Sequence, residues 1–274
     1  MTELHLFAGA GGGILGGLLL GHTPVCAVEI DPYCQEVLRA RQRDGMLPAF
    51  PVYGDIRSFD GSPWKGRVDI VAGGFPCVDI ATIGNVVLER KGIDGPHSRL
   101  WREMARIIGE VRPRYVFVEN SPNLVRQGLT MVIGDLASLG YDARWTVLGA
   151  HRVGAPHRRN RIWILANANG EGLEERHWQA PKREARPTTT GGVGWNGEPR
   201  VLGVDDGLAD KLDEHPRYDG PAAARVWSPG SAPVQLVARG KWDREDRLRA
   251  IGNGQVPQCA AAAWRELMSW EVTA

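Results

Sequence analysis

A thiol, a carboxyl group and two guanidinium groups occur at four separate places in the chain, at Cys77, Glu119, Arg159 and Arg161. The thiolate is the reactive form of cysteine, and a free thiol with a pKa of about 8.5 is mostly protonated at neutral pH. A carboxyl group in a dry pocket keeps its proton well above the ordinary pKa of about 4.3. Arginine donates paired hydrogen bonds to carbonyl and phosphate oxygens. This set predicts that a thiolate adds to an electron-poor ring, which the acid protonates and the guanidinium groups hold.

The segments around these residues predict that the four groups meet at one edge of a sheet. Cys77 stands in a loop just past the fourth expected strand, and Glu119 comes at the end of the fifth. Arg159 and Arg161 come just before the last strand of the same region. Ligands of parallel sheets bind beyond the carboxyl ends of the strands. A Pro-Cys dipeptide or a strand-end glutamate alone has common structural explanations, but their joint placement favours a catalytic site.

The first two-thirds of the chain alternates between strand and helix patterns. We expect a helix from Pro32 to about Arg43, because Asp31 can cap it and a proline suits its first turn. The expected strands cover residues 4–7, 24–30, 50–53, 67–72 and 115–118, with an antiparallel pair at 141–148 and 161–166, and the other expected helices cover 14–20, 98–111 and 129–139. Alternating units of this length indicate the α/β class, with a doubly wound and mainly parallel sheet.

This alternation ends near Asn167, which predicts a division of the chain into three parts. Residues 168–244 are rich in Gly, Pro, Arg and Glu and show little periodicity, so they form either a small irregular domain or a disordered insert. The tryptophans in this stretch favour a folded domain, because disordered segments avoid aromatic residues. We therefore expect a catalytic and cofactor-binding domain over 1–167, a second domain over 168–244, and a C-terminal segment over 245–274 with a helix from about residue 258 to 270.

A second set of residues, also at expected strand ends, predicts a nucleoside site. The first strand ends at Phe7 and leads into a turn in which glycines let the backbone approach a ligand closely. The glycines concerned are Gly9, Gly11 and Gly12. Glu29 ends the second strand and is placed to bind ribose hydroxyls, while Asp55 follows the third and is placed to accept from an adenine amino group. With no Lys or Arg in the first loop, this set suits an uncharged adenosine better than a pyrophosphate, which favours S-adenosylmethionine over NAD.

The composition predicts a globular protein with reduced thiols. The 274 residues are 43% hydrophobic and carry a formal net charge of +1, so no global basic field indicates nucleic acid. None of the four cysteines forms a C-x-x-C pair, so we expect no metal site. The longest apolar run, residues 14–20, is far shorter than the ~20 residues of a membrane span. We expect no leader peptide, no membrane segment, and a cytoplasmic protein.

The motifs that carry these residues strongly resemble those of the DNA cytosine-5 methyltransferase family. Residues 7–12, Phe-Ala-Gly-Ala-Gly-Gly, resemble the cofactor loop, and residues 73–77, Gly-Gly-Phe-Pro-Cys, resemble the nucleophile loop. Glu119 and Asn120 match the Glu-Asn pair. Residues 156–161 are similar to the Gln-x-Arg-x-Arg segment, and residues 252–256, Gly-Asn-Gly-Gln-Val, resemble the closing motif. The motifs occur in the family's order along almost the whole chain, with residues 168–244 as the exception.

The resemblance implies a role for each matched residue. Cys77 is the nucleophile that adds to carbon 6 of a flipped cytosine, Glu119 engages ring nitrogen 3, and Arg159 and Arg161 hold the base carbonyl or the flanking phosphates. The implied contacts to S-adenosylmethionine are Phe7, Gly9, Gly11, Gly12, Glu29, Ile30, Asp55, Ile56, Pro76 and Asn253. The resemblance also implies that residues 168–244 recognise the target sequence and that the C-terminal helix returns to the catalytic domain.

Three residues depart from the family pattern without removing a catalytic group. Val78 replaces the Gln that commonly follows the cysteine, Ser121 replaces the Val after the Glu-Asn pair, and His157 replaces the Gln of the arginine motif. These changes put in doubt the loop's contacts to DNA and the packing behind Glu119.

We expect double-stranded DNA as the partner and a monomeric enzyme. Phosphate neutralisation supplies much of DNA affinity, and arginines cluster between residues 152 and 161, with a second basic cluster between residues 176 and 186. Three alternatives stay open at this point. They are an RNA (tRNA) cytosine-5 methyltransferase on the same fold, a non-catalytic DNA-binding relative, and a nicotinamide oxidoreductase.

Overall fold

The computed structural model describes residues 1–76, 100–155, 157–168 and 244–269. Cys77 and Val78, nearly all of the expected domain over 168–244 and the second basic cluster lie outside the described residues. The described residues of the catalytic region and of the C-terminal segment contain every other residue predicted to form the site.

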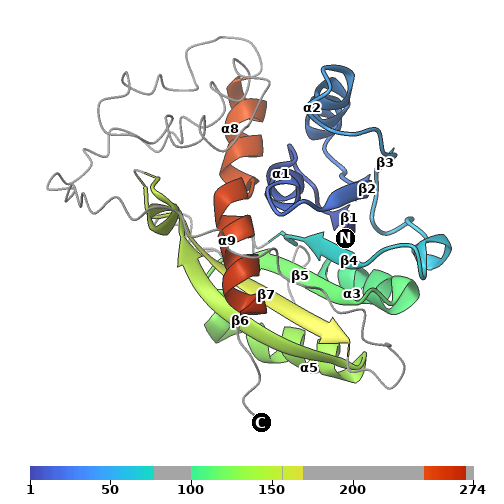
Figure 1. The fold of residues 1–274 in the computed structure, drawn as a ribbon, viewed down its shortest axis with the longest axis vertical. Helices are drawn as coiled ribbons and strands as arrows, with labels where there is room; N and C mark the ends of the chain where they lie inside the picture. The colour runs from blue at the N-terminus through green and yellow to red at the C-terminus, as the bar shows by residue number, and fades with distance from the viewer. Residues whose placement is uncertain (77–99, 156, 169–243, 270–274) are drawn as a thin grey trace, which may run out of the picture.

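A seven-stranded sheet in the order β3-β2-β1-β4-β5-β7-β6 forms the centre of the protein (Figure 1). The strands are β1 (Thr2–Leu6), β2 (Thr23–Val28), β3 (Val52–Tyr53), β4 (Ile70–Gly73), β5 (Tyr115–Asn120), β6 (Tyr141–Gly149) and β7 (Asn160–Ala168). The first five strands pair in parallel, whereas β7 pairs antiparallel with both β5 and β6. The α/β class, the mainly parallel sheet and the closing antiparallel pair are therefore confirmed.

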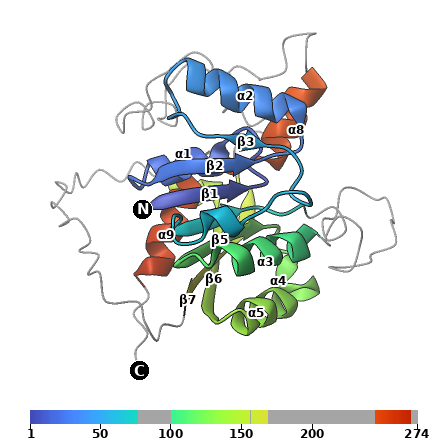
Figure 2. The same ribbon diagram turned by 90° about the vertical axis from the view of Figure 1, so that its right-hand side faces the viewer.

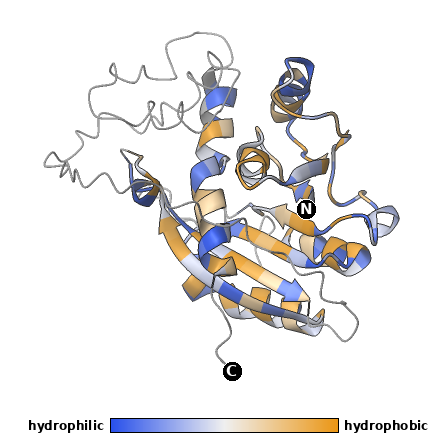
Figure 3. Ribbon diagram, viewed as in Figure 1, coloured by the Kyte–Doolittle hydropathy of each residue, from blue (hydrophilic) through white to orange (hydrophobic). Residues whose placement is uncertain are grey.

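Helices cover both faces of the sheet (Figure 2). The described helices are α1 (Gly12–Leu18), α2 (Pro32–Arg43), α3 (Leu100–Val111), α4 (Leu124–Gln127), α5 (Leu129–Ser138), α8 (Arg244–Asn253) and α9 (Pro257–Met268), with short 3-10 helices η1 (Ser62–Trp64) and η3 (Ala150–Val153). One core cluster joins Leu4 and Leu6 of β1 to α3 and α5. On the other face, Trp264 of α9 packs in a cluster with Phe117 of β5, and a third cluster joins α1 to α2. The middle strands are mostly hydrophobic, as burial on both faces requires (Figure 3).

Most expected elements lie within a few residues of their predicted bounds, and α2 matches its expected range. The Asp31 carboxylate accepts a hydrogen bond from the backbone N–H of Tyr33 at 2.9 Å, so Asp31 caps α2 as expected. The expectation that Arg161 comes just before the last strand was wrong, because β7 begins at Asn160 and includes Arg161, whereas the strand range expected over 161–166 agrees with β7 to within two residues. Helices α4 and α8 were not expected at all, and no described helix has the length and apolar character needed to cross a membrane.

Two histidines and a glutamate form a buried polar cluster between the sheet and α1. Glu3 accepts hydrogen bonds from His5 at 2.8 Å and from His22 at 2.6 Å. Burial by itself would raise the pKa of Glu3, but the two histidines outweigh it and lower that pKa to about 2. A Cβ at Gly17 of α1 would collide with this carboxylate, so the glycine lets α1 lie directly over the cluster. The cluster thereby fixes α1 behind the turn that carries the expected cofactor loop.

Close packing on α1 attaches the C-terminal segment to the sheet. A Cβ at Gly16 of α1 would lie 2.7 Å from the Cβ of Ala260 on α9. Real Cβ atoms do not approach so closely, so the missing side chain sets the distance between the two helices. Figure 1 shows α9 crossing the sheet beside α1. Helix α9 of the C-terminal segment thus packs against α1, the helix that follows the expected cofactor loop.

Candidate active site

Glu119 is a buried acid at the carboxyl end of β5, with 7% of its surface exposed. Its Oε1 accepts a hydrogen bond from Nε of Arg161 at 2.8 Å, and its side chain also hydrogen-bonds to that of Gln255. Burial raises the pKa of Glu119, while the positive charges of Arg161 and Arg159 act in the opposite direction with a smaller effect. The result is a carboxyl group that binds its proton more tightly than an exposed glutamate does, which a ring-protonating acid needs.

The two arginines of the predicted site have different contacts. Arg161 lies on β7, next to β5, and contacts the acid directly. Nη2 of Arg159 donates instead to three carbonyl oxygens at the end of α8, those of Ile251 at 2.8 Å, Gly252 at 3.0 Å and Gly254 at 2.6 Å. Arg159 has a φ of 30°, in the left-handed region that non-glycine residues seldom adopt. The structure therefore brings Arg161 to the acid, whereas Arg159 binds the C-terminal segment to the start of β7.

The loop that leads to Cys77 is fixed against β5. The side-chain amide of Asn120 donates to the carbonyl of Phe75 at 3.0 Å, and Asn120 is fully enclosed. A Cβ at Gly74 would lie 2.6 Å from Oε2 of Glu119, so only glycine leaves room for the carboxyl group. The described part of the loop, up to Pro76, thus lies beside the acid, and Cys77 is the next residue in the chain.

Glu29 fixes the expected cofactor loop at the end of β2. Its Oε2 accepts from the backbone N–H of Gly9 at 2.6 Å, and its Oε1 accepts from that of Asp31 at 2.8 Å. Burial raises the pKa of Glu29, and these backbone hydrogen bonds partly offset the effect. A carboxylate oxygen can accept more than one hydrogen bond, so both oxygens retain capacity for ribose hydroxyls.

The other expected cofactor residues differ in how they are presented. The side chain of Ile30 is 61% exposed, which is unusual for an isoleucine and leaves an apolar surface beside Glu29. Phe7 adopts a φ of 54° in the turn after β1, a strained conformation of the kind that is concentrated at functional sites. Asp55 accepts from Nη2 of Arg57 at 2.6 Å, so an adenine amino group would share this carboxylate. Ile56 is buried in the core, and its carbonyl already accepts hydrogen bonds from Arg106 and from the backbone N–H of Phe59. Asn253 is exposed at the end of α8.

Gln255 joins the two halves of the predicted site, although the sequence assigned it no role. A Cβ at Gly12 would collide with the Gln255 carbonyl, and one at Gly13 would lie 2.6 Å from its Oε1. On its other side, Gln255 hydrogen-bonds to Glu119. Gln255 therefore contacts both the expected cofactor loop and the acid, and it lies between them.

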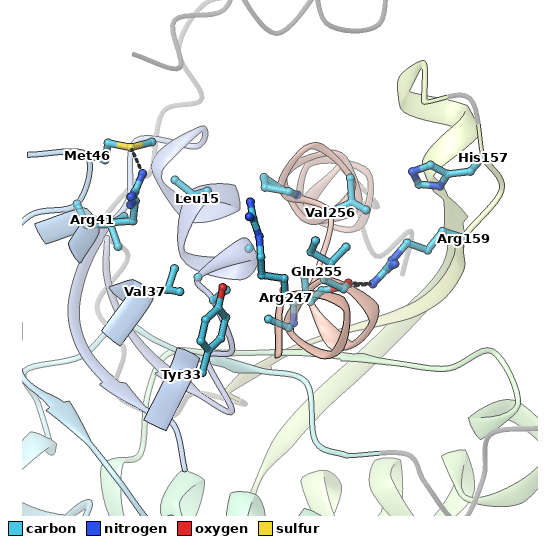
Figure 4. A pocket seen from close by; sticks show the side chains of 18 residues that line it. Leu15, Tyr33, Val37, Arg41, Met46, His157, Arg159, Arg247, Gln255 and Val256 are labelled. Atoms are coloured by element: carbon cyan, nitrogen blue, oxygen red, sulfur yellow. Dashed lines mark hydrogen bonds between the residues drawn. The ribbon is translucent and has the colours of Figure 1, made fainter. Parts of the chain in front are cut away.

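A pocket lies between α1 and α2 on one side and the α8–α9 turn on the other. In Figure 4, Tyr33, Val37 and Arg41 line one wall, while His157 and Arg159 lie across from them. The pocket includes Gly11 and Gly12 of the cofactor loop and Gln255, but not Phe7, Glu29 or Asp55. An adenosine held by those acids would therefore lie beside this pocket rather than inside it. Within the described residues, no three His, Cys, Asp or Glu side chains gather as metal ligands.

The sequence singled out Glu119 and Arg161, which the structure brings together, but not three residues that position them and the adjoining loop. Asn120, Gly74 and Gln255 all stand in the quoted motifs, yet their contacts join segments far apart in the chain. One available signal was the polar Gln255 between a glycine and the apolar start of α9. Another was the pair of adjacent glycines at the end of β4, which indicates close approach of another group.

These features match a known class of protein. Residues 1–206 match the family described as C-5 cytosine-specific DNA methylase. The chain belongs to this family, which confirms the resemblance read from its motifs.

Individual relatives cover the same region. The type II methyltransferase M.CviJI of Paramecium bursaria Chlorella virus IL3A is 34% identical over 164 residues, covering 60% of this chain and 42% of the relative. The type II methyltransferase M2.BsuMI of Bacillus subtilis (strain 168) is 31% identical over 175 residues, covering 61% of this chain and 42% of the relative. This chain thus matches less than half of the length of either relative. The structure of the Entamoeba histolytica methyltransferase EhMeth superposes with a TM-score of 0.50 at 13% identity, over 64% of this chain and 55% of that one, a likeness of fold alone.

Proposed function

We propose that this protein is a DNA cytosine-5 methyltransferase that uses S-adenosylmethionine as its methyl donor. The observation that carries the proposal is the buried Glu119, which is paired with Arg161 at 2.8 Å and separated from the cofactor loop by Gln255 alone. An acid with a raised pKa suits a reaction in which a ring nitrogen must be protonated. Membership of the C-5 cytosine-specific DNA methylase family supports the same reaction.

The proposed chemistry assigns one step to each of the residues around the base. The Sγ of Cys77 adds as a thiolate to carbon 6 of the cytosine while Glu119 places a proton on ring nitrogen 3. Carbon 5 then has the electron density to take an electrophilic methyl group, which S-adenosylmethionine supplies when bound. A water molecule then takes the proton from carbon 5, the electrons of that C–H bond form the double bond between carbons 5 and 6, and the C6–S bond breaks to release the thiolate. Nitrogen 3 returns its proton to Glu119. Arg161 fixes the acid throughout and is placed to reach the base carbonyl.

The residues at the ends of β1, β2 and β3 fit an adenosyl donor. Glu29 keeps acceptor capacity for the ribose, and exposed Ile30 offers an apolar face for the adenine ring. The glycines of the loop leave its backbone accessible, and the loop contains no cation that would favour a pyrophosphate. We assign Asp55, Ile56, Pro76 and Asn253 to the same site, as the motifs imply.

We further propose that double-stranded DNA is the substrate and that residues 168–244 read its sequence. The target cytosine has to leave the helix for a buried acid to reach its ring, at a cost of a few kcal/mol. We propose that the protein is a monomer and acts in the cytoplasm. We also propose that its chain divides into three parts, with boundaries after residues 167 and 244. Size-exclusion chromatography with light scattering tests the monomer, since an eluting mass near twice the 30.0 kDa of one chain would contradict it.

Transfer of a labelled methyl group to duplex DNA and to tRNA, measured side by side, tests the proposed activity. We expect label in cytosines of DNA and none in tRNA above the Cys77→Ala background. Bisulfite sequencing of DNA from expressing cells then gives the target site. Label in tRNA alone would establish the RNA reaction instead, and label in neither would overturn the proposal.

A further inference from the structure

Gln255 occupies a position that the proposed reaction does not yet use. It lies in the turn between α8 and α9, and its side chain reaches the buried carboxyl group of Glu119. Its Nε2 and Oε2 of Glu119 both crowd the space where a Cβ of Gly74 would be, at 3.2 and 2.6 Å from that point. A carboxylate only accepts, so the amide N–H of Gln255 is the donor.

The other end of the same residue is fixed by the cofactor loop. Gly12 and Gly13 at the start of α1 leave space that the Gln255 carbonyl and Oε1 fill. His5 of β1 lies beneath this contact, with its Nδ1 3.6 Å from the site of a Gly13 Cβ. Because the residue is held on two sides, its amide cannot turn away from the acid without moving the α8–α9 turn or α1.

We propose that Gln255 is a positioning residue that aims the Glu119 carboxyl group at the base and so makes the C-terminal segment part of the catalytic site. The inference rests on the proposed function, in which Glu119 is the acid. Arg161 holds Oε1, and Gln255, whose Nε2 lies with Oε2 beside Gly74, also donates to the carboxyl group, so the two donors together limit how the group can turn. A carboxyl group fixed in this way delivers its proton along one direction, which the alignment of a reacting base requires.

The charges around Glu119 explain why a neutral donor suits this position. Arg161 on β7 and Arg159 in the preceding loop already favour the carboxylate, against the effect of burial. Among the described residues, Cys259 on α9 is a further titratable neighbour, and burial raises its pKa to about 11, so it stays uncharged. A lysine or arginine at position 255 would add a cation and promote loss of the proton, whereas an amide fixes the carboxyl group in both protonation states.

The decisive experiment compares Gln255→Met with wild type by two measurements. The first is a carbon-13 NMR titration of the Glu119 carboxyl, assigned with Glu119→Gln, and the second is single-turnover methyl transfer to duplex DNA. Gln42→Met is the matched control, because Gln42 also donates from its amide, to the carbonyl of Phe50 at 2.8 Å. Both substitutions remove one amide hydrogen bond, but only one of them is next to the acid.

We expect Gln255→Met to raise the Glu119 pKa, because a donor to the carboxylate is lost, and to slow transfer about ten- to a hundredfold. The dissociation constant of S-adenosylmethionine should stay within about threefold of wild type. Gln255→Glu should raise the pKa of Glu119 further, because a second carboxyl group then faces the first. The control should match wild type in both measurements.

The two measurements separate failure of this inference from failure of the proposed function. The positioning role is wrong if Glu119 has the same pKa in Gln255→Met as in wild type and the variant transfers methyl groups as fast as Gln42→Met. If wild type methylates no nucleic acid, the proposed function is wrong, and the NMR titration still decides whether Gln255 controls Glu119.

Discussion

At the scale of the residue, burial of Glu119 has two opposing effects. The proposed reaction needs an acid that keeps its proton, and burial favours the protonated form by raising the pKa of the carboxyl group. The same burial makes the ionised form unfavourable, so the folded protein is destabilised wherever that form is populated. Active sites commonly hold groups that reduce stability in this way.

Replacing the acid with its neutral isostere should separate these two effects. Glutamine cannot donate the proton, so Glu119→Gln should lower the rate of methyl transfer about 10²- to 10⁴-fold. Binding of S-adenosylmethionine, measured by calorimetry, should change little, since the cofactor residues are untouched. A rate within tenfold of wild type would remove Glu119 from the acid role.

The same variant should be more stable than wild type at high pH. Because the folded pKa of Glu119 lies above its ordinary value of 4.5, the wild type loses stability as the pH rises through the folded pKa, whereas glutamine does not titrate. We expect Glu119→Gln to melt at a higher temperature at pH 8 and the difference to close as the pH falls toward about 4.5. Equal melting curves at pH 8 would show that burial imposes no net penalty on the carboxylate.

The sequence led to proposals for individual reactive residues but not for the contacts that position them. Cys77, Glu119 and Arg161 could be proposed because their types and strand-end positions carry chemical meaning. The hydrogen bond from Asn120 to Phe75 and the contact of Gln255 with the acid could not be predicted, because they join segments whose relative placement only the folded sheet defines. The contacts of Arg159 could not be predicted either, since its guanidinium group donates to carbonyls at the end of α8 and just beyond it.

At the scale of the element, α1 and α9 depend on the absence of side chains between them. Gly16 lies within α1, where alanine is normally the more favourable residue by about 1 kcal/mol. Its Cβ, however, would lie 2.7 Å from the Cβ of Ala260, and neither the helix nor a methyl group can easily yield. Packing therefore overrides helix propensity at this position.

An alanine at each of two helical glycines should have opposite effects. We expect Gly16→Ala to reduce the free energy of unfolding by about 1–3 kcal/mol, because it overpacks the α1–α9 contact. Gly134→Ala in α5 should increase it by up to about 1 kcal/mol, since nothing lies within 4 Å of the added methyl group. Urea denaturation measures both. A stabilising Gly16→Ala would show that α9 does not pack on α1 as described.

Element types were predictable from periodicity, but α8 was not. Its first turn contains Glu245 and Asp246, and it ends in a Gly-Asn-Gly sequence. A polar segment of this kind shows no apolar stripe from which a helix could be predicted. Strand β7 starts at Asn160 because it pairs with Gly149 of β6 there, a long-range contact that the local pattern does not contain.

At the scale of the whole molecule, a net charge of +1 has to be reconciled with DNA as a partner. Exposed Arg152 and Arg158 stand next to the start of β7, close in sequence to Arg161. A local basic surface can supply phosphate contacts that the total charge does not reveal. The fold class followed from alternating patterns, whereas the order β4-β5-β7-β6 at one end required the structure.

Removal of one phosphate contact should appear in the salt dependence of DNA binding. If Arg158 contacts a phosphate, Arg158→Ala should reduce the slope of log K against log salt by about 0.9 and weaken all sequences equally. Arg67→Ala is the control, because exposed Arg67 precedes β4 at the opposite end of the strands. A slope unchanged from wild type would exclude Arg158 from the DNA surface.

Covalent trapping on duplex DNA that contains 5-fluorocytosine tests the proposed reaction most directly. Fluorine at carbon 5 cannot leave as a proton does, so the adduct between the enzyme and the base persists after methyl transfer. With S-adenosylmethionine present, wild type should form a complex that survives denaturing electrophoresis, and Cys77→Ala should form none. Active wild-type enzyme that forms no such complex, or a Cys77→Ala variant that forms it equally well, would contradict the account.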